Sequence, residues 1–136
     1  MEDQRIGSKC ATLAKKAGLT LKYCDALYNN GNLVEMSCNS SFVEEHDVWS
    51  LAPTQSLLQK RLRSKNVVVL VEHGRLSNNS FGYFSRVYPN IKNGGSGQFK
   101  VFEYRKKYED ALEQGLIGGL FSLINKKKEL ELQEKF

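Results

Sequence analysis

The segment from Lys107 to Ile124 has the composition of an amphipathic helix, yet it contains three glycines. Each glycine inside a helix costs about 1 kcal/mol relative to alanine, so a compensating interaction is expected. Ala111, Gly115 and Gly119 are spaced four residues apart and share one face, beside a ridge of leucines. Such small side chains let a helix approach its neighbour closely and gain dispersion contacts. The pattern predicts close packing through this face against a sheet, with a second copy of the chain as the alternative neighbour.

Hydrophobic periodicity and turn residues predict the other elements. In order, these are a helix capped by Ser8 and ended by Gly18, strands near 22–28 and 33–38 joined through Asn30-Gly31, a helix capped by Thr54, strands at 67–74, 81–88 and 98–104, and the glycine-containing helix. The uninterrupted β-branched start of 67–74 predicts a central strand that is buried on both faces. Short connections predict antiparallel pairing.

These elements predict an α+β fold, with an antiparallel sheet and helices packed on one of its faces. A chain of 136 residues fits a single domain. Residues 1–52 are expected to form a helix, a hairpin and an irregular connector in which Trp49 packs on the core. Residues 53–124 are expected to form an α-β-β-β-α core, and the charged residues 125–136 a frayed tail. Leu57, Leu58 and Leu62 are the expected buried stripe of the helix after Thr54.

Basic residues are concentrated in the middle of the chain. The net charge is +5, but residues 53–107 contain eleven Lys/Arg and two Asp/Glu, whereas 1–52 and 108–136 each carry −2. Such segregation creates a local field that attracts nucleic acid or an acidic protein. A basic surface that is simply solvated is the alternative interpretation. The candidate binding residues are Lys60, Arg61, Arg63, Lys65, Arg75, Arg86, Lys100, Arg105, Lys106 and Lys107.

The three cysteines, Cys10, Cys24 and Cys38, are widely spaced and include no Cys-x-x-Cys pair. This spacing argues against a zinc site and a disulfide framework, so reduced thiols in an intracellular protein are expected. No apolar run is long enough to cross a bilayer, and the charged N-terminus lacks the apolar stretch of a secretory signal. We therefore expect a cytoplasmic protein without membrane association.

No residues in the sequence are arranged for catalysis. Neither His46 nor His73 lies in a motif that pairs a nucleophile with a base. The GGSG segment at 94–97 lacks the lysine and the following helix of a phosphate-binding loop. Glu109 and Glu113 are one helical turn apart, but without a partner histidine they are expected to face solvent. We expect a non-enzymatic protein that uses no metal or cofactor.

Two segments resemble a group of small uncharacterised proteins from phages and prophages of gut Bacteroidales. PTQSLLQKRLR, within 52–63, resembles a PTQSLLQKWLRE-like helix, with Arg61 where that pattern usually has a tryptophan. KYEDALEQGLIGGL, within 107–124, resembles a TYEEALEAGL-like terminal helix. The resemblance implies a phage-type accessory protein in the cytoplasm of a bacterial host cell, and it implies no activity.

The α-β-β-β-α order also resembles that of double-stranded RNA-binding domains, which grip two minor grooves and the phosphates between them. Arg105, Lys106 and Lys107 stand where those domains have a basic cluster, at the start of the final helix. The Gly-Pro-x-His loop of that family is missing here, and Glu109 and Glu113 make the helix acidic after its first residues. Fold order alone does not imply function.

The sequence thus predicts a small accessory protein that acts by macromolecular binding. Its basic surface would meet nucleic acid or an acidic host protein. The alternative is a protein-interaction or inhibitor module that is homodimeric through the glycine face.

Overall fold

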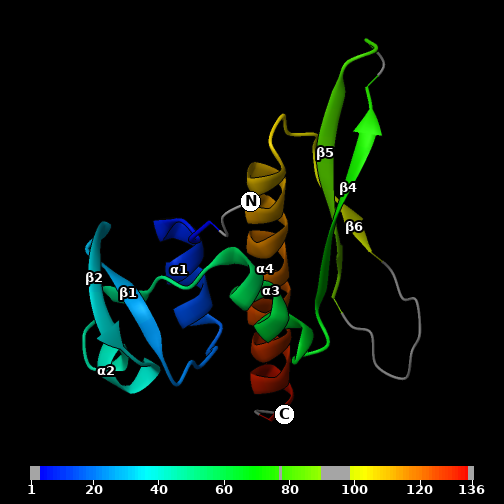
Figure 1. Ribbon diagram of the computed structural model, residues 1–136. Helices are drawn as coiled ribbons and strands as arrows, with labels where there is room; N and C mark the ends of the chain where they lie inside the picture. Colours follow the sequence, from blue (N-terminus) through cyan, green and yellow to red (C-terminus); the bar gives the residue numbers. More distant parts are fainter. Residues whose placement is uncertain (1–3, 77, 90–98, 135–136) are drawn as a thin grey trace.

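The computed structural model describes residues 4–76, 78–89 and 99–134 of the chain. Helices are interspersed with strands along it, as Figure 1 shows, and the predicted α+β class is confirmed. The elements are α1 (Ser8–Lys16), β1 (Cys24–Asn29), β2 (Asn32–Cys38), α2 (Ser40–Glu44), β3 (Trp49–Leu51), α3 (Gln55–Arg63), β4 (Val68–Arg75), β5 (Phe81–Tyr88), β6 (Lys100–Val101) and α4 (Tyr108–Glu134).

The described strands form two three-stranded antiparallel sheets, with the orders β2-β1-β3 and β4-β5-β6. The predicted Asn-Gly turn joins β1 to β2, and both Asn30 and Gly31 have the positive φ that this turn needs. The connector expected to be irregular contains α2 and β3, because Leu51 and Trp49 pair with β1. As expected, Trp49 is half-buried, and its ring packs on those of Phe42 and His46.

Helix α4 lies flat on the sheet β4-β5-β6, with α3 beside it on the same face (Figure 1). Ala111 is fully buried, and a Cβ atom added to Gly115 would lie 2.7 Å from both Ser85 Cβ and Val69 Cγ1. At Gly119 the nearest atom would be Val67 Cγ1, at 3.1 Å. The predicted helix–sheet packing is confirmed. The alternative, in which a second copy packs on the glycine face, is wrong, because the chain's own sheet already covers that face.

The main core lies between α4, α3, α1 and this sheet. Its members are apolar side chains from all four parts, namely Ile6, Cys10, Ala11, Leu58, Leu62, Val67, Val69, Val87, Leu112, Leu116 and Leu120. A smaller core under the N-terminal sheet contains Cys24, Leu27, Cys38, Val43 and Leu51. Leu57 is exposed instead of joining the stripe, because Gln55, Leu58 and Leu62 occupy the inward face of α3.

Strand β4 lies at the edge of its sheet and β5 at the centre, so the prediction of a central strand at 67–74 is wrong. Side chains of β4 alternate, with Val69 buried and Leu70 exposed, because helices cover one face only. The third strand is shorter than predicted, since β6 spans Lys100–Val101, and Gln98 lies outside the described residues. The GGSG segment at 94–97 lies outside them as well.

Helix α4 does not fray at residue 125 but continues to Glu134. Its last turns are rich in lysine, glutamate and leucine, which have high helix propensity. Buried Ile124 and half-buried Leu123 anchor the start of this extension. Residues 135–136 lie outside the described part.

Candidate nucleic-acid interface

The ten predicted basic residues do not form one compact patch. Two groups lie beyond opposite ends of β4, which puts them roughly 23 Å apart for a strand of this length. One group lies in the C-terminal half of α3 and just after it, and comprises Lys60, Arg61, Arg63 and Lys65. The other comprises Arg75, Arg105, Lys106 and Lys107. Arg86 lies in β5 and Lys100 in β6, between the groups.

Arg61 has a structural role that the sequence did not reveal. Its Nε donates to the Thr20 carbonyl oxygen at 3.0 Å, and its Nη2 donates to Thr20 Oγ1 at 3.1 Å. Its Nη1 donates to Ser64 Oγ at 3.1 Å. These bonds tie α3 to the segment that follows α1. Arg61 is therefore engaged by the chain itself, whereas Lys60, Arg63 and Lys65 are exposed.

Basic and aromatic side chains alternate at the far end of the β4–β5 hairpin, which projects beyond the start of α4 (Figure 1). Arg75 pairs across the strands with Phe81, and Tyr83 pairs with Arg105 on its other side. We call these residues, together with His73 and Tyr108, the hairpin-end cluster. The His73 and Phe81 rings stack with centroids 5.3 Å apart, and the Tyr83 and Tyr108 rings meet edge to face at 5.9 Å. Lys106 and Lys107 are exposed between the cluster and α4.

The face of the sheet β4-β5-β6 that points away from α4 is rich in aromatic side chains. We call it the outer face, and its members are Val68, Leu70, Glu72, Phe84, Arg86, Tyr88, Phe99, Val101 and Tyr104. The sequence alone did not reveal this set. The signal was partial, because Phe84, Arg86 and Tyr88 recur with period two, whereas Phe99 and Tyr104 are five residues apart. What was missing was that helices would cover only the opposite face.

Arg86 joins two aromatic pairs of the outer face into one row. Its guanidinium carbon is 5.6 Å from the Phe84 ring centroid and 5.1 Å from that of Phe99. At the two ends of the row, the ring centroids of Tyr104 and Phe84 are 5.0 Å apart, and those of Tyr88 and Phe99 are 5.2 Å apart. These distances are typical of cation–π and aromatic contacts.

The polar partners of Arg86 are few. Its Nη2 lies 3.5 Å from Glu72 Oε2. This ion pair neutralises the charge of Glu72, the carboxylate among the outer-face residues. Its Nε is buried and has no hydrogen-bond partner among the described residues. The row Tyr104–Phe84–Arg86–Phe99–Tyr88 is thus held by ring contacts more than by hydrogen bonds.

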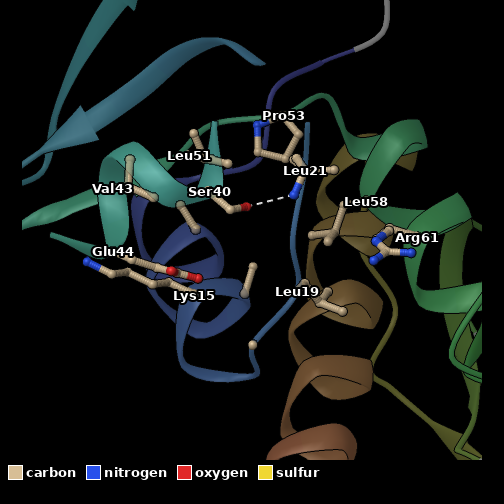
Figure 2. A pocket seen from close by; sticks show the side chains of 13 residues that line it. Lys15, Leu19, Leu21, Ser40, Val43, Glu44, Leu51, Pro53, Leu58 and Arg61 are labelled. Carbon is tan, nitrogen blue, oxygen red and sulfur yellow. Dashed lines mark hydrogen bonds between the residues drawn. The ribbon is translucent and has the colours of Figure 1, made fainter. Parts of the chain in front are cut away.

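A small apolar cavity lies among α1, α2, β3 and α3 (Figure 2). Its volume is about 40 Å³, far below the roughly 300–1,000 Å³ typical of small-molecule sites. The polar groups at its edge are used by the chain. Ser40 Oγ accepts from the Leu21 backbone N–H at 2.6 Å, and Lys15 Nζ donates to the carbonyl oxygens of His46 and Trp49. The cavity is a gap in the packing between the two cores.

Glu113 does not face solvent as the sequence predicted. One carboxylate oxygen accepts from the Gly7 backbone N–H at 2.7 Å, and the other accepts from Gln55 Nε2 at 3.2 Å. Gln55 is only 2% exposed and also donates to the Glu109 carbonyl oxygen at 2.9 Å. Glu113 is therefore a structural residue. Within residues 4–76, 78–89 and 99–134, no three His, Cys, Asp or Glu side chains group as a metal site.

The three cysteines are free and buried. Cys24 and Cys38 are cross-strand partners in β1 and β2, whereas Cys10 lies in the main core. Burial raises the pKa of the Cys10 thiol. Burial is the main cause that raises the pKa of the Cys38 thiol to about 11, and the neighbouring Cys24 is the second cause.

We expect these thiols to react slowly with Ellman's reagent in the folded protein. At about pH 8 only about one Cys38 in a thousand would be thiolate, the reactive form. The same protein in guanidinium chloride should release colour for three thiols at once. Rapid reaction of any thiol without denaturant would contradict the buried placement.

The chain matches no protein-family model, no curated protein and no solved structure at a significant level. Of the helices in the described part of the chain, none is long and apolar enough to cross a membrane.

Proposed function

We propose that the protein is a non-enzymatic binding protein whose basic C-terminal sheet binds nucleic acid. The observation that supports this most is the interleaving of cations with aromatic rings at the hairpin-end cluster, where Arg75 and Arg105 flank Phe81 and Tyr83. Cations neutralise phosphates, and rings stack on bases. Nucleic acid uses both features together, with phosphates on the cations and bases on the rings, which is why we favour it over an acidic protein.

The phosphate contacts are assigned to the exposed cations near the hairpin end, above all Lys106 and Lys107. Both precede α4, and among the described residues neither forms an ion pair with the chain. The resemblance of 52–63 and 107–124 to phage proteins supports a phage-type accessory role in the cytoplasm of a bacterial host cell.

Binding is expected to weaken steeply with salt. Each neutralised phosphate releases counterions, so log K falls linearly with log salt concentration, with a slope near one per contact. In fluorescence anisotropy with labelled oligonucleotides, Lys106→Ala/Lys107→Ala should weaken binding and reduce the slope by about 1.5.

The matched control is Lys127→Ala/Lys128→Ala, which removes two adjacent exposed lysines from the other end of α4. This variant should keep the wild-type slope. Absence of binding to any single- or double-stranded oligonucleotide at about 50 mM salt, where screening is weak, would reject the proposal. Binding to polyglutamate under the same conditions would then assign the basic surface to an acidic protein.

A further inference from the structure

The outer face is an open platform of rings on the most basic part of the chain. Phe99 and Tyr104 are 46% and 41% exposed, and Leu70 and Val101 are exposed beside them. Both helices of the C-terminal half pack on the opposite face (Figure 1). Exposed aromatic rings gathered on one surface mark an interaction site more often than scattered ones do.

We propose that this outer face binds single-stranded nucleic acid, with bases stacked on Phe99 and Tyr104, the two most exposed rings of the row. The inference rests on the proposed function and names the form of nucleic acid that this sheet takes.

The geometry of the row fits successive unpaired bases. Phe99 and Tyr104 flank Arg86 and Phe84 along one face, and neighbouring groups in the row are 5.0–5.6 Å apart. Every base has a flat π-face that stacks on aromatic rings and on guanidinium planes without sequence preference. The bases of a duplex are already stacked on each other and cannot lie flat on a sheet, so this surface favours single strands.

The charge around the platform fits a polyanion. Three exposed cations, Arg105, Lys106 and Lys107, directly follow Tyr104 in the chain. On the outer face itself, the carboxylate of Glu72 is paired with Arg86.

The test compares single strands with an abasic oligomer of the same charge, and all of these with a duplex, which carries about twice as many phosphates. Labelled oligo(dT) and oligo(U) of about 12 nucleotides, a duplex of the same length and an abasic deoxyribose phosphate oligomer are titrated with the full chain. The single strands should bind at least about tenfold more tightly than the abasic oligomer, since stacking is lost without bases. The difference between oligo(dT) and oligo(U) shows whether DNA or RNA is preferred.

Phe99→Ala and Tyr104→Ala should each weaken single-strand binding by about tenfold without changing the salt slope. The matched control is Phe121→Ala, which removes an equally exposed ring (44%) from α4. It should bind as the wild type does.

Equal affinity for single strand, duplex and abasic oligomer, or aromatic variants that behave like Phe121→Ala, would overturn the stacking inference while leaving charge-driven binding intact. Failure of all four oligomers to bind would instead reject the proposed function itself. Since Phe99 and Tyr104 are exposed, circular dichroism of the variants should match that of the wild type, so lost affinity reports on the surface.

Discussion

Replacing Gly115 by leucine is expected to lower the free energy of unfolding by at least about 3 kcal/mol, because the new side chain has no space. Even a Cβ atom would lie 2.7 Å from Ser85 Cβ and from Val69 Cγ1, so α4 must lift from β4 and β5. The core residues Leu116 and Leu120 would lift with it. Chemical denaturation followed by circular dichroism measures the loss.

Alanine substitutions separate this clash from helix propensity. Gly115→Ala and Gly118→Ala both gain about 1 kcal/mol of propensity. At Gly118 the added Cβ meets only the far end of the Phe102 ring, which can turn aside. Gly115→Ala should therefore be the less stable of the two variants. A folded Gly115→Leu variant that has lost a dimeric mass in sedimentation would contradict this and assign the glycine face to a contact between copies.

Replacing Glu113 by alanine is expected to destabilise the protein by about 3 kcal/mol. The substitution removes two hydrogen bonds to a carboxylate and leaves Gln55 with one partner fewer in a buried site. The bond to the Gly7 N–H is also a substitute cap for α1, because Gly7 at the N-cap position of α1 has no side chain. Thermal unfolding measures the effect.

The control for Glu113 is Asp110→Ala, which removes an exposed carboxylate one turn earlier in α4. Its loss should cost less than about 1 kcal/mol, the usual contribution of a charge near a helix end. Glu113→Gln should fall between the two, since the amide keeps an acceptor but loses the charge. If Glu113→Ala were as stable as Asp110→Ala, the link between α1 and α4 would have no energetic importance.

Local features of the fold were predictable because neighbouring residues encode them. Thr54 caps α3 by accepting from the Leu57 N–H, and Gly18 ends α1 with a positive φ. In contrast, Ser8 was expected to cap α1, but the helix begins at Ser8 itself. The start of α1 could not be predicted locally, because the carboxylate that accepts from the Gly7 N–H belongs to Glu113, 106 residues further along the chain.

The candidate interface was only partly predictable for a similar reason. The concentration of positive charge between residues 53 and 107 is a property of composition, and it does not say which side chains share a surface. The structure divides those cations between two ends of β4 and engages Arg61 with Thr20. It also exposes the rings of Phe99 and Tyr104, which the sequence alone could equally have placed in a core.

The sequence by itself determined α1, α3, the β1–β2 hairpin and the close approach of α4, because spacing and φ preferences act within a few residues. Only the tertiary structure decided that the described strands pair as two sheets, that β5 is central and that the helices of the described part leave one face of the second sheet uncovered. Those outcomes depend on contacts between residues far apart in the chain, which leave no local period to detect. The aromatic outer face exists because both available helices pack on the same side.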